Sequence, residues 1–101
     1  MPTYAEVIEH ENSALPNIIR LVASGQFYRA YNRSAWLFNT CIVSYKVIRK
    51  YVKAIQNDIR YIGFPISSVE NILKNRTLVT TEYGVDIILF EMEEKGSDCA
   101  E

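Results

Sequence analysis

Hydrophobic and polar positions follow two different periods along this chain. Within residues 3–11 apolar side chains recur at helical spacing, and Thr3 and Glu6 stand three residues apart in the pattern of a capping box, which predicts a helix. Residues 17–24 and 27–31 are short runs rich in strand-forming residues, with a Gly-containing turn between them. The short link predicts that these two strands form an antiparallel hairpin.

A second helix is expected next in the chain. Asn32 or Ser34 can cap its N-terminus, and the helix is expected to extend to about Val43. The side chains available for its buried face are Ala35, Trp36, Phe38 and Ile42.

Residues 45–56 fit two periodicities. Their apolar side chains fall at helical spacing with basic side chains opposite, which slightly favours a helix. Their Tyr and Val residues are good strand formers, and a strand remains an open alternative on propensity alone.

The C-terminal part predicts a short helix followed by a hairpin. Ser67 or Ser68 can cap the helix, which runs through Leu73, and residues 77–81 and 85–92 form the two strands. Residues 93–101 are polar and acidic and are expected to be a disordered tail, so the predicted domain covers residues 1–92. The fold class expected from these elements is α+β, a mixed sheet of about six strands flanked by about three short helices.

Size and composition are those of one globular domain. The chain has 101 residues, 49% of them hydrophobic, and no apolar run approaches the length of a membrane span. The N-terminus lacks the basic region of a secretory signal, and Cys41 and Cys99 have no metal-ligand spacing. We therefore expect a cytoplasmic protein with reduced cysteines and no membrane partner.

A net charge of −1 conceals a strong asymmetry along the chain. Residues 17–60 carry eight basic residues against Asp58 alone, a net of +7, whereas both ends of the chain are acidic. The basic middle can bind an anionic partner such as DNA, or its charges can be neutralised by acids across the folded surface. A pI near 5.8 is low for a protein that mainly grips phosphates.

Two motifs, one after the other along the chain, resemble those of a known protein family. An apolar strand leads into Gly25-Gln26-Phe27-Tyr28-Arg29, and Gly63-Phe64-Pro65 later opens a helix that contains Glu70 and Leu73. In this respect most of residues 5–92 resembles the N-terminal mismatch-recognition domain of the MutS DNA mismatch-repair family. That domain has a Gly-Asp-Phe-Tyr-Glu turn after its strand and a Gly-hydrophobic-Pro segment before a later helix.

The resemblance implies a fold and a role. A strand follows the first internal helix in the family, so we predict that residues 45–56 form a strand, which turns through residues 56–58 and pairs with residues 59–63. The family's Phe stacks on a mispaired base from the minor groove, a role that would fall to Phe27. The family's Glu, which hydrogen-bonds that base, is replaced by Arg29, and its Asp by Gln26. The guanidinium would instead contact phosphate or the minor groove.

Aromatic and basic residues alternate around this turn, as they do in single-strand binders. The expected DNA-binding residues are Phe27, Tyr28, Arg29, Arg33, Lys46, Arg49, Lys50 and Lys53. The alternative is structural: Phe27 would be a buried strand residue, and Tyr and Lys are common in strands for packing and edge protection.

Catalytic signatures are lacking in the sequence. It contains no Gly-rich phosphate loop, no Ser-His-Asp motif and no zinc spacing. We therefore expect a protein that is not an enzyme, with no catalytic residues, metal, cofactor or small-molecule substrate.

The leading hypothesis is a stand-alone module that binds double-stranded DNA at distorted or mispaired sites. The alternative is a protein-interaction or regulatory module that kept the MutS domain I fold without DNA binding. A homodimer joined through an exposed strand edge is a further possibility.

Overall fold

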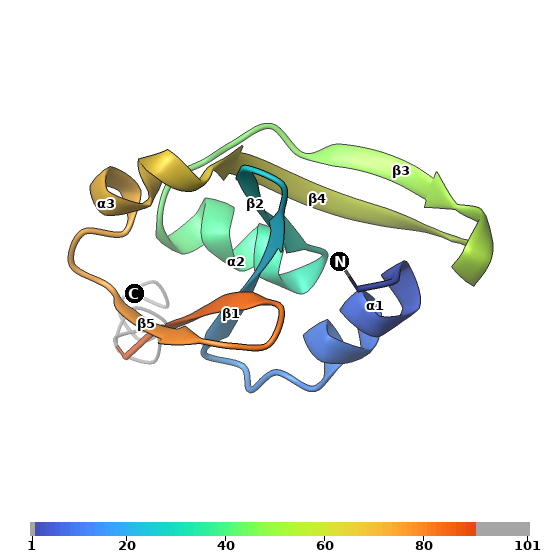
Figure 1. The fold of residues 1–101 in the computed structure, drawn as a ribbon. Helices are drawn as coiled ribbons and strands as arrows, with labels where there is room; N and C mark the ends of the chain where they lie inside the picture. The colour runs from blue at the N-terminus through green and yellow to red at the C-terminus, as the bar shows by residue number, and fades with distance from the viewer. Residues whose placement is uncertain (1, 91–101) are drawn as a thin grey trace, which may run out of the picture.

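One antiparallel sheet organises the protein, and the computed structural model describes residues 2–90. Its strands lie in the order β3-β4-β2-β1-β6-β5 (Figure 1). Every strand pairing among the described residues is antiparallel, so the expected α+β class is confirmed while the sheet is not of mixed direction. The strands are β1 (Ile18–Ser24), β2 (Phe27–Tyr31), β3 (Ile48–Val52), β4 (Asn57–Pro65), β5 (Thr77–Thr80) and β6 (Gly84–Ile88). The α-helices are α1 (Tyr4–Asn12), α2 (Arg33–Cys41) and α3 (Val69–Ile72).

The predicted N-terminal helix and hairpin are confirmed. The Thr3 hydroxyl accepts the Glu6 N–H at 3.2 Å and a Glu6 carboxylate oxygen accepts the Thr3 N–H at 2.8 Å, which completes the capping box of α1. Strands β1 and β2 pair from Ser24↔Phe27 onward. Gly25 makes the turn at φ 63°, where a side chain would be strained.

The ambiguous segment is a strand. Ile48 to Val52 form β3, which pairs with β4 from Ile48↔Tyr61 to Val52↔Asn57 through a single 3₁₀ turn at Lys53–Ile55. The strand prediction drawn from the family resemblance is therefore confirmed for residues 48–52, whereas the predicted turn through residues 56–58 is wrong, because Asn57 and Asp58 already pair within β4. The helical spacing was misleading because β3 lies at the edge of the sheet and only its Val52 is buried. Its exposed positions are therefore free of the alternation of apolar and polar residues that marks a half-buried strand.

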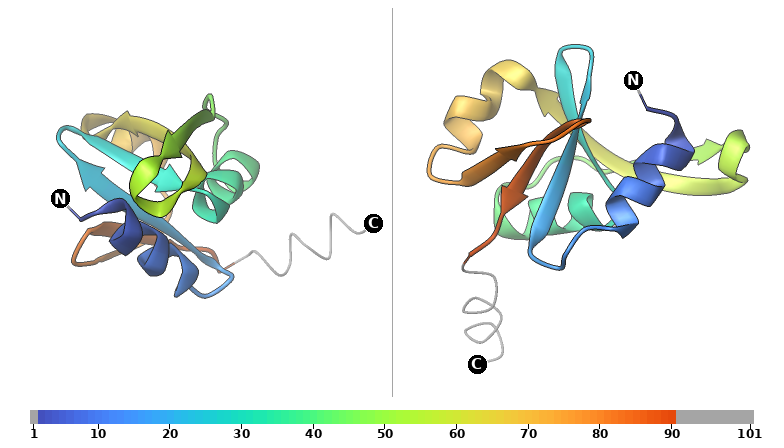
Figure 2. Two further views of the ribbon diagram at one scale, coloured as in Figure 1. Left: turned by 90° about the vertical axis from the view of Figure 1, so that its right-hand side faces the viewer. Right: turned by 60° about the horizontal axis from the view of Figure 1, so that its bottom comes forward.

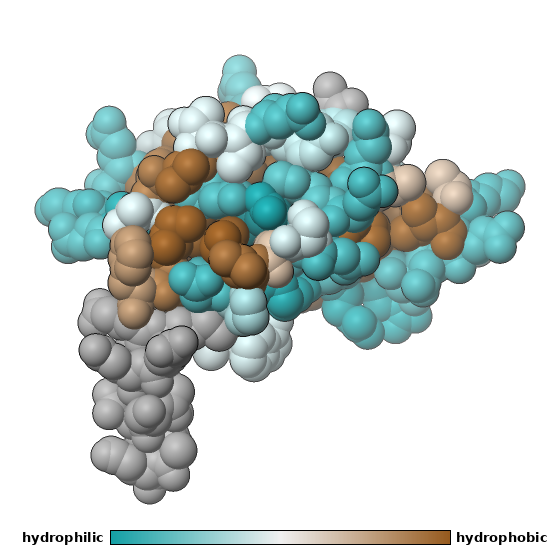
Figure 3. Space-filling view, turned by 90° about the horizontal axis from the view of Figure 1, so that it is seen from below, coloured by the Kyte–Doolittle hydropathy of each residue, from teal (hydrophilic) through white to brown (hydrophobic). Residues whose placement is uncertain are grey.

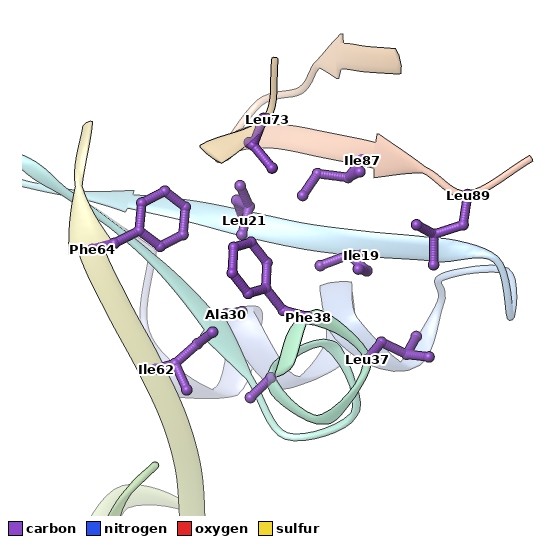
Figure 4. Close-up of a cluster of buried hydrophobic side chains, with 11 residues drawn as sticks. Ile19, Leu21, Ala30, Leu37, Phe38, Ile62, Phe64, Leu73, Ile87 and Leu89 are labelled. Carbon is purple, nitrogen blue, oxygen red and sulfur yellow. The ribbon is translucent and has the colours of Figure 1, made fainter. Parts of the chain in front are cut away.

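The main core lies between the sheet and α2 (Figure 4). Phe38 stacks on Phe64 with ring centroids 5.2 Å apart. Around this pair, every second residue of four strands points to the same face. Ile19, Leu21, Ala30, Ile62 and Ile87 are the members of that set with no more than 1% exposure.

The predicted buried side of α2 is partly wrong. Ala35 and Phe38 are buried, but Trp36 is 65% exposed and Leu37 is buried instead. The helix has Arg33 as its first residue, which turns Ser34, Ala35, Leu37 and Phe38 toward the sheet and Trp36 toward solvent.

The expected serine and asparagine caps do not form. Asn32 stands at the N-cap position of α2 with φ 47°, and its side-chain oxygen accepts the Arg60 N–H at 3.0 Å instead of capping the helix. Ser34 is inside α2. Ser68 precedes α3 without a capping bond.

A smaller core lies on the opposite face of the sheet, under α1. Val7 of α1 packs with Val22, Tyr31, Val52 and Ile59. Helices α1 and α2 therefore cover opposite faces (Figure 2).

The C-terminal hairpin is shorter than predicted. Strand β5 ends at Thr80 and β6 ends at Ile88, before the predicted Met92. β6 begins at Gly84, where a β-carbon would clash with the Leu21 carbonyl oxygen of β1. The predicted domain end and acidic tail lie outside the described residues. Among residues 2–90 no helix is long and apolar enough to cross a membrane.

Candidate nucleic-acid interface

Phe27 lies at the first position of β2, directly after the β1–β2 turn. Its side chain is 50% exposed, so Phe27 is not the buried core residue of the structural alternative. It pairs with Pro65 of β4, and the carbonyl of the preceding Gln26 accepts the Ile66 N–H at 2.9 Å. The backbone around this aromatic side chain is therefore fixed to the neighbouring strand.

Arg29 points to the same face as Phe27, because the two residues are two positions apart in one strand. Its guanidinium carbon lies 4.6 Å from the centre of the Tyr61 ring, a cation–π contact that supports the side chain without using an acid. Gly63 is the cross-strand partner of Arg29. Because Gly63 has no side chain, the space beside the Arg29 stem stays open.

Lys50 brings a second cation to this face. Its Nζ donates a hydrogen bond to the Tyr4 hydroxyl at 3.1 Å, and it lies 5.2 Å from the centre of the Tyr4 ring. The hydrogen bond from Lys50 lowers the pKa of Tyr4 and raises the pKa of Lys50. Tyr4 is the first residue of α1, so the N-terminus of that helix borders the site.

Tyr28 and Arg33 do not join this group. Tyr28 points to the opposite face, where its ring packs 6.2 Å from that of Phe64. Arg33 has its Nε 3.1 Å from a carboxylate oxygen of the buried Glu11, and its Nη2 donates to the Ile18 carbonyl at 2.7 Å. Arg33 is thus engaged in holding α2 to α1 and β1.

The remaining predicted cations follow the edge strand. Arg49 points away from Lys50 by strand alternation, and its Nε lies 3.1 Å from an Asp58 carboxylate oxygen. Lys46 and Lys53 are exposed just before and just after β3.

The structure therefore brings Arg29 and Lys50 together with Tyr4 and Tyr61, while Phe27 lies on the same sheet face at the turn end of β2. We call Phe27, Arg29, Lys50, Tyr4 and Tyr61 the Phe27 surface. Tyr61 was missed in the sequence, although the predicted pairing of residues 45–56 with 59–63 was the signal that placed it on this sheet. Tyr4 was missed as well, because the helical spacing of residues 3–11 indicates a helix and not a place beside the sheet.

Both interpretations of the basic segment are partly realised. Arg20 lies 2.7 Å from Asp86, and Arg33 and Arg49 are paired with acids as described, so part of the charge is neutralised within the protein. Arg29 and Lys50 contact tyrosines instead, and they keep their charge available to an anionic partner.

Comparison with protein families gives one match, to MutS domain I, over residues 3–98. The chain belongs to the MutS domain I family. No match was found among curated proteins or among solved structures.

MutS domain I is a non-catalytic DNA-recognition domain. In this member the Phe-Tyr pair of the family turn stands at Phe27 and Tyr28, while Arg29 replaces the family's Glu. Arg29 points to the same face as Phe27, so the substitution changes the charge of the surface that carries the aromatic ring.

Proposed function

We propose that this MutS domain I protein binds double-stranded DNA at distorted or mispaired sites and catalyses no reaction. The observation that carries the proposal is the half-exposed Phe27 ring on a fixed hairpin turn. An exposed apolar ring on a rigid turn can enter a base step, and unstacking costs least where the pair is already mismatched.

Cations beside the ring support the proposal. Arg29 and Lys50 lie on the same sheet face as Phe27 and follow it in one direction along β4, where they can meet phosphates that lead away from an inserted ring. Lys46 and Lys53 extend the positive charge along the edge strand. Two or three phosphate contacts predict that log affinity falls with log salt with a slope of about −2 to −3.

Fluorescence anisotropy of labelled duplexes tests this proposal. Matched, mismatched and single-stranded oligonucleotides would be titrated with the protein at two salt concentrations. We expect affinity that is highest for the mismatched duplex and weakens with salt. No binding at low salt would favour the alternative of a protein-interaction or regulatory module, for which the internal pairing of Arg20, Arg33 and Arg49 is the supporting observation.

Arg29→Glu restores the residue of the family motif and makes a second prediction. We expect overall affinity for DNA to fall, because a cation is replaced by an anion, while the ratio of mismatched to matched affinity rises about fivefold through one added hydrogen bond to a base. Anisotropy on paired duplexes measures both quantities.

Lys50→Glu is the matched control for Arg29→Glu. It makes the same charge change on the same face but at an exposed position on β3, away from the turn. We expect affinity to fall without a change in the mismatch ratio. An equal effect of both variants on the ratio would contradict the proposal that a side chain at position 29 lies beside the mispaired base.

A further inference from the structure

Strand β5 leaves one edge of the sheet without a partner among the described residues. All four of its residues, Thr77 to Thr80, are exposed and uncharged, and Val79 and Leu78 are 48% and 38% exposed. Figure 3 shows apolar side chains gathered on the side of the molecule that carries the β5–β6 hairpin. An uncharged, apolar edge of this kind is a template for pairing with another strand.

The opposite edge of the sheet is protected. Strand β3 carries Arg49 and Lys50, with Lys46 and Lys53 beside its two ends. Charged side chains, lysine above all, are the usual protection of an edge strand against pairing. The two edges therefore differ in charge, the property that decides whether an edge strand can pair with a second strand.

The hydrogen-bond pattern shows which backbone groups of β5 are free. Thr81 N–H donates to the Gly84 carbonyl at 2.8 Å, which sets the phase of the β5–β6 ladder. Because direction alternates along a strand, Thr77 and Val79 direct their backbone groups toward β6, whereas Leu78 and Thr80 direct theirs outward. Two N–H and two C=O groups therefore face solvent along this edge.

We propose that this protein forms a two-fold homodimer in which β5 pairs antiparallel with β5 of a second copy. The axis is normal to the sheet and passes between the two Val79 residues. In this register Leu78 of each copy lies opposite Thr80 of the other, and the two pairs satisfy all four outward groups.

Side chains and charges fit the same register. The two Val79 residues form a non-hydrogen-bonded pair, the arrangement in which facing side chains approach most closely. The β5 end that follows Arg76 in one copy meets the β5 end that precedes Glu82 in the other, and these opposite charges are complementary, although Arg76 also donates to the Cys41 carbonyl at 3.0 Å. A net charge of −1 leaves little repulsion between copies.

Sedimentation velocity and light scattering of the full chain test the dimer. We expect the average molecular mass to rise from 11.6 kDa toward twice that value as the protein concentration rises from about 10 µM to about 1 mM. A broad range is needed because an interface of one short strand pair is weak. Val79→Lys places two like charges at the axis. Thr80→Pro removes one outward N–H from each copy and leaves the bonds to β6 in place. Each variant is expected to raise the dimer dissociation constant at least tenfold.

Tyr51→Lys is the matched control, because it adds a lysine at an exposed position of the other edge strand. It is expected to leave the dissociation constant within about twofold of the wild-type value. A protein that stays monomeric at the highest concentration, or that dimerises equally well with Val79→Lys and Thr80→Pro, would overturn the proposal.

Cysteine cross-linking tests the register. In a chain with Cys41→Ser and Cys99→Ser, Val79→Cys is expected to give a disulfide-linked dimer on mild oxidation, whereas Leu78→Cys is not. Cross-linking through position 78 in place of 79 would overturn the axis at Val79.

Discussion

Replacing Glu11 by alanine is expected to lower the free energy of unfolding by about 2 kcal/mol, the size of effect seen when a charge-assisted hydrogen bond is lost, because its partner Arg33 is 35% exposed and keeps access to water. Glu11 is 4% exposed and joins α1 to α2. The Ser34 hydroxyl donates to its carboxylate at 2.6 Å, and the Arg33 guanidinium lies 3.1 Å from its other oxygen. Urea denaturation followed by circular dichroism measures the change.

The same site predicts a pH effect. Burial raises the pKa of Glu11 above its usual value of 4.5, against the opposing effects of the Ser34 hydrogen bond and of Arg33. The folded protein therefore holds this proton more tightly than the unfolded chain does. Protonation of Glu11 therefore stabilises the folded state. This contribution to the free energy of unfolding is complete below pH 4.5 and is lost as the pH rises through the raised pKa. As the pH rises over this range, the free energy of unfolding of the wild type should fall relative to that of Glu11→Gln.

Glu9→Ala is the matched control for Glu11→Ala. Glu9 lies on the same helix but is exposed, so its replacement should leave the urea midpoint unchanged. If the two alanine variants unfolded at the same midpoint, Glu11 would not be what holds α1 to α2.

Local signals predicted much of this fold. The capping box at Thr3 and the apolar run before Gly25 depend only on neighbouring residues, and the structure has both α1 and the β1–β2 hairpin. The error at Trp36 has a different origin. Which side chains α2 buries depends on where the helix begins, and it begins at Arg33 after Asn32, whose φ of 47° a cap preference does not reveal.

The candidate site was less predictable than the fold. Arg33 forms an ion pair with Glu11. The whole β1–β2 hairpin lies between these two residues in the chain, so no local sequence pattern links them. Whether Phe27 is exposed depends on where β2 begins relative to its neighbour β4, and this is a property of the assembled sheet. The family motif located Phe27, while the tertiary structure decided which cations accompany it.

Phe27→Ala is expected to weaken binding to a mismatched duplex about tenfold or more, because base–aromatic stacking contributes about 1–3 kcal/mol. Binding to a matched duplex should weaken by less than about threefold, since phosphate contacts dominate there. Phe27 is half exposed and lies outside both cores, so the fold should be retained. Anisotropy at one salt concentration measures the two affinities.

Two variants make this prediction specific. Phe90→Ala removes a phenyl ring that is 72% exposed after β6, and it should change neither affinity. Phe27→Tyr keeps an aromatic ring at the turn and should retain the mismatch preference. An equal loss for both duplexes in Phe27→Ala would mean that the ring contributes general contact rather than stacking at the mismatch. With no loss at all, Phe27 would have no part in DNA binding, and the Phe27 surface would remain available for a protein partner.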